Sequence, residues 1–345
     1  MIKRIITYFK MDGKTYPSTM KAIIIEHFGG PDSLVIKDVP TPEPEDGYVV
    51  IQIKAFGVNH AEMHMRRGEW AESMPIIGIE CVGLVVACPS GEFAPGTPVA
   101  ALMGGLGRTI NGSYAQFTRA PVSNVVALGD AIAALSWAQL AAIPESYATA
   151  WTCLFRNLEL RAGQTLLIRG ATSAFGKAAV NLAVQAGAQV SATTRKQERF
   201  DDLKGLGVKE ALLEGPDLSA RLDGRKFDAV LELVGNSTLL DSLMLVRRGG
   251  RLCLAGFLGG LAPIADFNPL LQMASGVHFS FFGSFVFGTP EFPLSDVPLH
   301  SIVKMVAEKK FGAEPARIFK FEKISDSHRV MEANEANGKM VVCVD

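Results

Sequence analysis

Two kinds of hydrophobic pattern divide this chain of 345 residues. Between residues 34 and 96, short apolar runs such as Leu34–Asp38 and Tyr48–Phe56 are separated by proline and glycine, which predicts an irregular β-rich domain. From residue 165 onwards, apolar runs alternate with helical segments, which is typical of a parallel sheet covered by helices. The pattern therefore predicts an α/β protein, and the length favours two domains.

The clearest unit of the α/β part spans residues 165–199. The apolar run Thr165–Ile168 is too short for a helix and predicts a buried parallel strand. A turn of small residues, Gly170–Ala174, leads into Phe175–Ala186, which combines good helix formers with an apolar face. A second strand, Gln189–Thr194, follows. In such a βαβ unit the first turn presents the amides of a helix N-terminus, so it is the candidate site for a pyrophosphate.

This turn departs from the dinucleotide fingerprint G-x-G-x-x-G, because only the last glycine of the window 171–176 is present. The alanine and serine in the other two places are small enough to let the backbone approach a phosphate, and the serine hydroxyl is a further donor. The alternative is an ordinary strand-to-helix turn of another α/β protein. The lysine that follows either reaches the phosphates or points to solvent. The candidate cofactor-binding residues here are Ala171, Thr172, Ser173, Ala174, Phe175, Gly176 and Lys177.

The end of the second strand indicates which dinucleotide is bound. NAD-binding folds usually carry an acidic residue there to hold the ribose 2′-hydroxyl, whereas this chain reads Thr194, Arg195, Lys196. Two cations at this place favour a 2′-phosphate, so the sequence predicts NADP(H) and adds these three residues to the cofactor site. The alternative is a solvated helix start whose charges face water.

Further elements continue the alternation. Strands are expected at Ala22–Glu26, Ala211–Leu213, Phe227–Val234, Arg251–Ala255 and His278–Phe282, and helices at Trp137–Ala142, Thr238–Val246, Ser301–Lys310 and Ile324–Asn337. The loop Gly256, Phe257, Leu258 falls at the carboxyl end of a parallel strand, where open α/β sheets bind ligands, so it is a candidate cofactor contact.

Charge, hydrophobicity and cysteine usage argue against several classes of protein. The formal net charge is −1 and the basic residues are scattered, so no nucleic-acid footprint is visible. Residues 267–290 carry no charged side chain, but proline, glycine and polar residues interrupt them, which argues against a membrane span. The five cysteines are widely spaced without a C-x-x-C pair, so we expect reduced cysteines in a cytoplasmic protein, with neither disulfides nor a zinc cluster.

The first nineteen residues lack the layout of a signal peptide, because Lys10, Asp12 and Lys14 end the apolar part too soon for a cleavage site. We interpret residues 1–19 as an N-terminal extension. The alternative is that they follow an upstream start codon that is not used, so that translation begins at Met20.

Several short motifs occur in a fixed order along the chain. Gly57-Val58-Asn59, the segment Pro75–Gly83, Pro95–Val99 and the segment Gly112–Phe117 all precede the βαβ unit, and Gly338–Val342 comes near the end. Each is loose alone, but their order and spacing resemble the medium-chain dehydrogenase/reductase superfamily, in particular its zinc-free quinone oxidoreductase branch. The resemblance covers nearly everything from Met20 onwards.

This resemblance implies a GroES-like β-rich catalytic domain from residues 20–140 and 290–345, which encloses a doubly wound Rossmann domain at residues 141–289. It implies a homodimer formed through the edge strand 278–282. Tyr147 and Thr149 either line the nicotinamide or pack between the domains. Lys339, in the closing strand, joins the cofactor-binding candidates.

The chain also departs from the zinc-dependent members of that superfamily. Asn59 stands where they have a cysteine ligand and Ile79 where they have a histidine, and neither residue replaces it as a zinc ligand. Their four-cysteine lobe is represented only by Cys88, and His60 and His64, although spaced i, i+4, have no third ligand. No metal site is predicted.

Without a Lewis acid, alcohol oxidation is disfavoured, whereas hydride delivery to a quinone or enone needs only hydrogen-bond donors for the acceptor oxygen. The predicted function is thus a cytoplasmic NADPH-dependent reductase of a small-molecule acceptor. Asn59 is the first candidate for a catalytic or cofactor contact, and the alternative is an asparagine that stabilises a turn. His64 is a candidate proton source, and the alternative is a surface or core histidine with a structural role. Glu80 is expected to support local structure. The alternatives are an enoyl-thioester reductase and a non-catalytic NADPH-binding sensor or structural protein.

Overall fold

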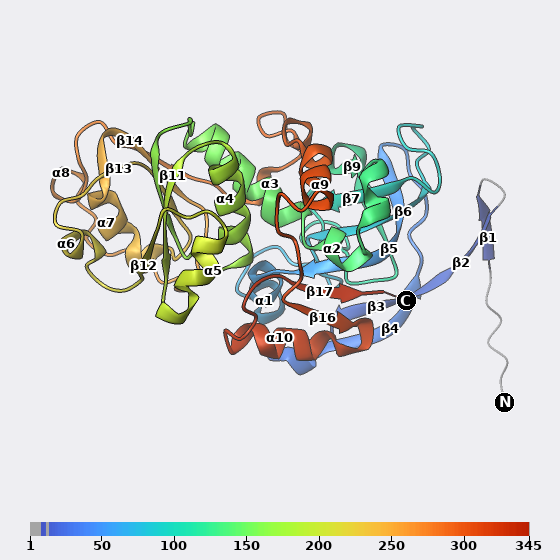
Figure 1. Ribbon diagram of the computed structural model, residues 1–345. Helices are drawn as coiled ribbons and strands as arrows, with labels where there is room; N and C mark the ends of the chain where they lie inside the picture. Colours follow the sequence, from blue (N-terminus) through green and yellow to red (C-terminus); the bar gives the residue numbers. More distant parts are fainter. Residues whose placement is uncertain (1–7, 12–13, 345) are drawn as a thin grey trace. The chain divides into compact units, whose positions relative to one another are not determined.

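The computed structural model describes residues 8–11 and 14–344 and divides the chain into two compact units (Figure 1). The first unit combines the chain up to residue 145 with residues 284 onwards, and the second unit comprises residues 146–283. None of the helices in the described part of the chain has the length and apolar character needed to cross a membrane.

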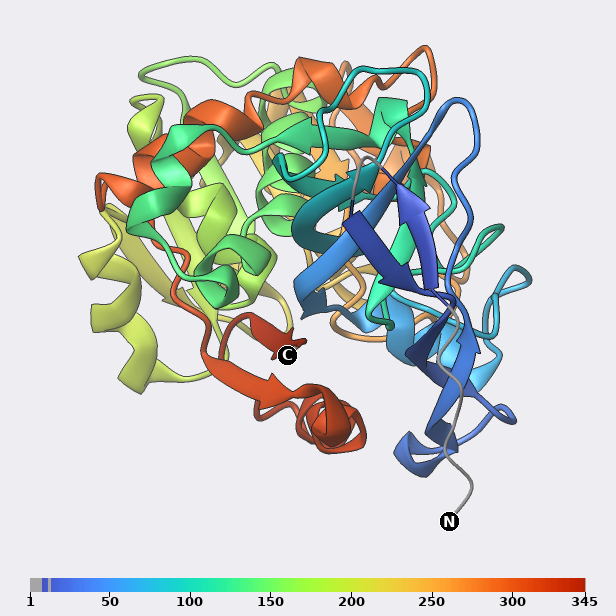
Figure 2. The same ribbon diagram turned by 90° about the vertical axis from the view of Figure 1, so that its right-hand side faces the viewer.

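The first unit is built on a seven-stranded sheet in the order β16-β17-β5-β6-β7-β9, with β8 paired to β5. All of its strand pairs are antiparallel except β16 with β17. Its strands are β5 (Tyr48–Val58), β6 (Glu80–Ala87), β7 (Pro98–Leu102), β8 (Phe117–Pro121), β9 (Val125–Ala127), β16 (Arg317–Lys320) and β17 (Met340–Cys343). Its helices are α1 (His60–Arg67), α2 (Trp137–Ala141), α9 (Leu299–Ala307) and α10 (Ile324–Glu332). Figure 2 shows α10, at the red end of the colour bar, almost end-on beside the strand that leads into it.

Two small hairpins precede this sheet. Strand β3 (Thr19–Ile25) pairs with β4 (Leu34–Pro40), so the strand expected from Ala22 begins three residues earlier. Within the predicted N-terminal extension, β1 (Tyr8–Met11) pairs with β2 (Lys14–Pro17). The remaining part of that extension before Lys14, residues 1–7 and 12–13, lies outside the described residues.

The second unit contains a six-stranded sheet in the order β12-β11-β10-β13-β14-β15, and every pair in it is parallel. This order confirms the predicted doubly wound parallel sheet. Its strands are β10 (Thr165–Arg169), β11 (Gln189–Thr194), β12 (Glu210–Leu213), β13 (Phe227–Glu232), β14 (Val246–Leu254) and β15 (His278–Phe281). Its helices are α3 (Pro144–Thr152, which begins at the junction), α4 (Ala174–Gln185), α5 (Phe200–Gly205), α6 (Leu218–Arg221), α7 (Asn236–Met244) and α8 (Pro269–Gln272).

Two element boundaries differ from the prediction by five residues each. The last helix ends at Glu332 rather than Asn337, because Asn334 and Asn337 take left-handed backbone conformations with φ of 56° and 57°. Strand β14 begins at Val246 rather than Arg251, with an irregularity in its pairing to β13 that accommodates Gly249 and Gly250.

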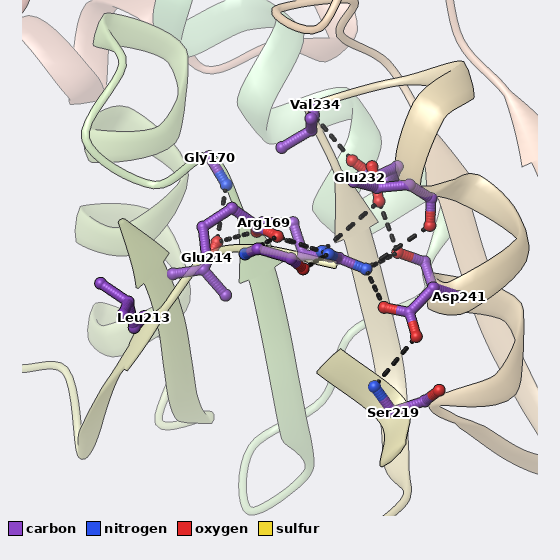
Figure 3. Close-up of polar contacts among 12 residues, drawn as sticks. Arg169, Gly170, Leu213, Glu214, Ser219, Glu232, Val234 and Asp241 are labelled. Carbon is purple, nitrogen blue, oxygen red and sulfur yellow. Dashed lines mark hydrogen bonds and ion pairs between the residues drawn. The ribbon is translucent and has the colours of Figure 1, made fainter. Parts of the chain in front are cut away.

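A buried arginine connects the carboxyl ends of the strands in the second unit (Figure 3). Arg169, the last residue of β10, is fully buried. Its Nε donates to Glu214 Oε2 at 3.1 Å, its Nη2 binds the other Glu214 oxygen, and its Nη1 donates to Asp241 Oδ2 at 2.6 Å. Glu232, at the end of β13, faces the same guanidinium at 3.9 Å.

The carboxylates around Arg169 extend this cluster into the neighbouring loops. Glu214 accepts from the Thr193 hydroxyl of β11 at 2.6 Å, and Glu232 accepts from the amides of Val234 and Gly235 at 2.7 and 3.0 Å. Burial alone would lower the pKa of Arg169, but its bonds to the carboxylates, Glu214 first, raise it. Burial raises the pKa of Glu232. The arginine therefore neutralises acidic groups that hold four strand ends in place.

Replacing this arginine should destabilise the second unit severely. In Arg169→Met the buried carboxylates lose their counter-ion, so we expect the free energy of unfolding to fall by about 3–5 kcal/mol, measured by urea denaturation. Arg225→Met is the matched control, because Arg225 pairs with Glu210 where both side chains are more than a third exposed. It should cost less than about 1 kcal/mol. Equal losses in the two variants would contradict this account.

Candidate functional site

The turn after β10 has the features of a phosphate cradle. Ser173 is the N-cap of α4, and its hydroxyl accepts from the Gly176 amide at 3.0 Å. A Cβ at Gly176 would lie 2.5 Å from Ala171 Cα, so only glycine allows the helix to pack this closely on the turn. The amides of Ala174 and Phe175 belong to the first turn of α4, which has no intrahelical partner to offer them. The turn therefore presents a helix N-terminus, as the sequence predicted.

The predicted donor role of the Ser173 hydroxyl is not what the structure shows. Its proton goes to the Gly170 carbonyl at 2.9 Å, while its lone pair caps the helix. The side chain thus closes the turn on itself. Binding of a phosphate by residues 171–176 stays a prediction, and the donors would be backbone amides rather than the Ser173 hydroxyl.

Basic side chains gather beside this turn. Arg195 and Lys196, after β11, are exposed, and Thr194 is buried with its hydroxyl accepting from the Lys196 amide at 3.3 Å. On α4, burial lowers the pKa of Lys177 and the positive charge of Arg199 lowers it further, so these two cations lie close together. Arg199 is a candidate that the sequence interpretation missed, because its closeness to Lys177 depends on the packing of two helices.

The candidate loop after β14 lies along the ends of the neighbouring strands. The amides of Leu258 and Gly259 donate to Leu233 and Val234 at 3.2 and 2.7 Å, and the Leu258 side chain lies beside Gly170. The loops that follow β10, β13 and β14 therefore meet at one edge of the sheet. This edge includes Gly256 and Phe257 of the predicted site.

A cavity of about 490 Å³ opens at the same edge, between the segment that follows β12 and helix α7. Gly215 and Pro216 line one side, Ser237 and Thr238 line the other, and Arg169 contributes to the wall. Its volume is in the range typical of small-molecule sites.

Tyr147 and Thr149 of α3 are both buried. The Tyr147 hydroxyl accepts from the side-chain amide of Asn181 on α4 at 2.8 Å, and burial raises the pKa of Tyr147 well above its usual range. Within the second unit Tyr147 thus joins two helices. The two roles proposed for these residues from the sequence stay predictions.

In the first unit, Asn59, Glu80 and Lys339 form a compact polar cluster. The Asn59 amide nitrogen donates to Glu80 at 3.0 Å, its oxygen accepts from Lys339 Nζ at 2.6 Å, and Lys339 also pairs with Glu80. Glu80 is fully buried and Lys339 is 6% exposed. Burial alone would lower the pKa of Lys339, but the negative charges of Glu80 and Glu145 raise it. The predicted catalytic and cofactor-binding atoms of Asn59 and Lys339 are thus engaged with one another and with Glu80.

Glu62 is a second buried carboxyl beside this cluster, and it was missed as a site residue. Its carboxylate accepts from the backbone amides of Asn59 at 2.8 Å and Ile79 at 3.1 Å, and burial raises its pKa to about 7. A sequence signal existed, because Asn59-x-x-Glu62 has the spacing of a capping box at the start of α1.

His64 lies on α1, away from this cluster's hydrogen bonds. Its Nδ1 pairs with Glu69, and its ring stacks on Trp70 with centroids 6.0 Å apart. Its side chain is 12% exposed. The predicted proton-donor role therefore concerns a histidine that already has a carboxylate partner.

The zinc positions named above are occupied by side chains that cannot ligate. Ile79 is buried and apolar, and Asn59 is engaged as described. Among residues 8–11 and 14–344, no group of three or more histidine, cysteine, aspartate or glutamate side chains could hold a metal ion.

Comparison with known proteins places both parts of the chain. A family model described as the alcohol dehydrogenase GroES-like domain matches residues 45–130, and one described as zinc-binding dehydrogenase matches residues 174–299. These matches confirm the predicted combination of a GroES-like β-rich domain with a Rossmann domain.

The chain is similar to quinone oxidoreductases along most of its length. The quinone oxidoreductase of Sus scrofa is 30% identical over 269 residues, which cover 74% of this chain and 78% of the relative. That of Homo sapiens is 27% identical over 339 residues, covering 94% and 97%. A mycobacterial protein solved in complex with NADPH superimposes with a TM-score of 0.81 at 24% identity, covering 94% of this chain and 99% of that chain.

The buried Glu62 should make stability depend on pH. Its pKa is 4.5 in the unfolded chain and about 7 in the folded protein, so the folded state binds the proton more tightly. The stabilisation is complete below about pH 4.5 and is lost as the pH rises through 7, a change of about 3 kcal/mol.

Urea denaturation between pH 4.5 and 8 tests this. Compared with the wild type, Glu62→Gln should lose less unfolding free energy as the pH rises, because it lacks the titrating carboxyl. Glu322→Gln, which removes an exposed carboxyl from the same unit, should follow the wild type. Parallel curves for all three proteins would refute the assignment.

Proposed function

Because the chain belongs to the quinone oxidoreductase-like branch of the medium-chain dehydrogenase/reductase superfamily, we propose that it is an NADPH-dependent reductase of quinones or α,β-unsaturated carbonyl compounds that works without a metal ion. Family membership makes it an oxidoreductase that uses a nicotinamide cofactor. The choice of NADPH, the class of acceptor and the independence from zinc are the proposal.

The observation that carries the choice of NADPH is the charge at the end of β11. Arg195 and Lys196 are exposed there, and the nearest strand-end carboxylate, Glu214, is already bound by Arg169 and Thr193. A ribose 2′-phosphate would find cations rather than a competing carboxylate. The mycobacterial relative of known structure was solved with NADPH.

The residues present fit the rest of the dinucleotide. In this proposal the pyrophosphate binds the amides at the N-terminus of α4, and the loop 256–258 borders the ribose and nicotinamide side. Adenine occupies the cavity beside Gly215 and Ser237. When bound, the reduced nicotinamide supplies a hydride, which together with one proton converts a quinone to a hydroquinone or an enone to a saturated carbonyl compound.

The protein's part is to position groups and to supply hydrogen bonds. Lys339 and Asn59 both bind the Glu80 carboxylate, and Lys339 also donates to Asn59. Because their polar side-chain atoms bind one another and Glu80, they act here as positioning residues for the start of α1. His64, paired with Glu69, is the proposed proton source. The side chains at 59 and 79 offer no zinc ligand, which supports chemistry on an activated acceptor rather than an alcohol.

We further propose that two copies associate through β15. This strand is at the edge of the parallel sheet, and Phe279 and Phe281 on it are 40% and 53% exposed. An apolar edge strand of this kind is a template for pairing with another chain.

Removal of the first cation should change cofactor selectivity. In Arg195→Ala we expect the KM for NADPH to rise about tenfold to a hundredfold with little change for NADH, because one charge-assisted hydrogen bond is lost. Arg161→Ala is the control, because Arg161 is exposed and precedes β10 at the amino ends of the strands, away from the proposed site. It should change neither constant. Equal efficiency of the wild type with the two coenzymes would refute the NADPH assignment.

A panel of quinones, enones and enoyl thioesters, followed by NADPH absorbance, tests the reaction. Oxidation of NADPH with quinones or enones is expected, and dialysis against a chelator should leave the rate unchanged. A preference for enoyl thioesters would favour the thioester reductase. Tight NADPH binding without turnover of any acceptor would favour a sensor, and a rate restored only by zinc would overturn the metal-free mechanism.

A further inference from the structure

The end of helix α1 brings two polar side chains of the first unit together. The Gly68 amide donates to the Met65 carbonyl at 3.0 Å. The Glu69 amide donates to the His64 carbonyl, also at 3.0 Å, and these two bonds form a Schellman motif. Gly68 has φ of 72°, the left-handed conformation that the motif requires at this position. The motif places the side chain of Glu69 beside that of His64.

Residues at these two positions of a Schellman motif commonly make an apolar contact, whereas here the contact is polar. His64 Nδ1 pairs with Oε2 of Glu69. The next residue, Trp70, stacks its ring on the imidazole with centroids 6.0 Å apart and an interplanar angle of 10°. Two consecutive residues therefore hold the imidazole, one at Nδ1 and the other on a ring face.

The carboxylate of Glu69 is itself oriented by a neighbouring cation. Its other oxygen, Oε1, lies 3.8 Å from Arg67 Nη1. Arg67 is fixed in turn by helix α10, because its Nε and Nη2 donate to Glu332 Oε1 at 3.2 and 2.8 Å. The positive charge of Arg67 thus favours the orientation in which Oε2 faces the imidazole.

The partner of Nδ1 determines which nitrogen of His64 can exchange a proton. A carboxylate only accepts hydrogen bonds, so the proton between the two side chains belongs to Nδ1 of the imidazole. In the neutral ring the lone pair is then on Nε2. Nε2 has no hydrogen-bond partner among residues 8–11 and 14–344, and the side chain is 12% exposed. Nε2 is therefore the nitrogen that remains available to a reacting group.

We propose that Glu69 is a positioning residue for His64, and that it makes Nε2 the atom from which the proton passes to the reduced acceptor. This inference rests on the proposed function, in which His64 is the proton source. It adds a residue that the sequence interpretation missed and assigns the transfer to one atom of the ring.

The transfer balances as follows in the proposed reaction. Hydride addition leaves an anion on the quinone or enone, and the His64 imidazolium gives it the proton of Nε2. The electron pair of that N–H bond stays on Nε2, so a neutral imidazole remains, with its Nδ1 proton still bound to Glu69. The carboxylate therefore stabilises the imidazolium before the transfer and keeps the correct tautomer after it. Solvent returns one proton to Nε2 before the next turnover.

The tautomer of His64 is the direct test, because a contact that only stabilises the fold would not control it. Two-bond ¹H–¹⁵N correlations of the full-length protein distinguish a protonated from an unprotonated ring nitrogen. The chain has six histidines, and the signals that disappear in His64→Gln identify this one. At about pH 8, above the ordinary pKa of histidine, the wild type should show a protonated Nδ1 and an unprotonated Nε2.

Glu69→Gln should change this tautomer without unfolding the protein, because the Glu69 side chain is 40% exposed. The carboxamide can donate as well as accept, so the form with the proton on Nε2 becomes populated. Glu72→Gln is the matched control, since Glu72 is an exposed carboxylate of the same segment that binds Arg108 at 2.8 Å instead of a histidine. It should leave the His64 signals unchanged.

Steady-state kinetics provide the second readout. Glu69→Gln should lower kcat about tenfold or more with little change in the KM of the acceptor, because the carboxylate acts on proton transfer and not on binding. His64→Gln should lower kcat at least as much. Glu72→Gln should change neither constant.

The outcomes separate this inference from the proposed function. The same tautomer in Glu69→Gln as in the wild type, or an unprotonated Nδ1 in the wild type, would overturn the inference even if quinones oxidise NADPH. An unchanged kcat in Glu69→Gln would also overturn it. A tautomer that depends on Glu69, in a protein that oxidises NADPH with none of the acceptors, would support the control of His64 by Glu69 and refute the reductase function.

Discussion

Neutralisation of buried charge by a single arginine is the constraint on which the second unit depends. Arg169 ends β10 and faces carboxylates from the ends of β12 and β13 and from α7. Those carboxylates in turn bind the Thr193 hydroxyl and the amides of Val234 and Gly235. The loops that form the proposed cofactor site are therefore fixed by groups beneath them, before any cofactor is bound, so that less ordering remains to be done on binding.

The first unit applies the same principle with a lysine. Lys339 approaches from β17 and compensates Glu80 at the start of β6, while Asn59 bonds to both. Asn59 of this cluster stands where the family resemblance predicts the cysteine ligand of zinc-dependent members. A fixed ammonium group supplies positive charge to the buried carboxylate there, and the proposed proton source, His64, is paired with Glu69 instead.

Local patterns in the sequence were enough to predict the βαβ unit, because strand period, small-residue turn and helix period all lie within one stretch. The strand Gln189–Thr194 is observed with the predicted bounds. Contacts between distant residues carry no such pattern: Arg169 meets Asp241 across 72 positions, and Lys339 meets Asn59 across 280. The occupied polar atoms of Asn59 depend on such contacts, whereas the capping signal of Glu62 was local and was overlooked.

Gly57 shows how tightly the lysine and the glutamate are packed. A Cβ at this position of β5 would overlap Glu80 Oε1 and lie 2.5 Å from Lys339 Cε, so the absence of a side chain makes room for the pair. Among homologous chains, positions 57, 80 and 339 should consequently change as a set: an alanine at the first is compatible with the fold only where smaller or uncharged partners replace the other two. Covariation at these three positions would identify the homologues that keep the buried ammonium–carboxylate pair.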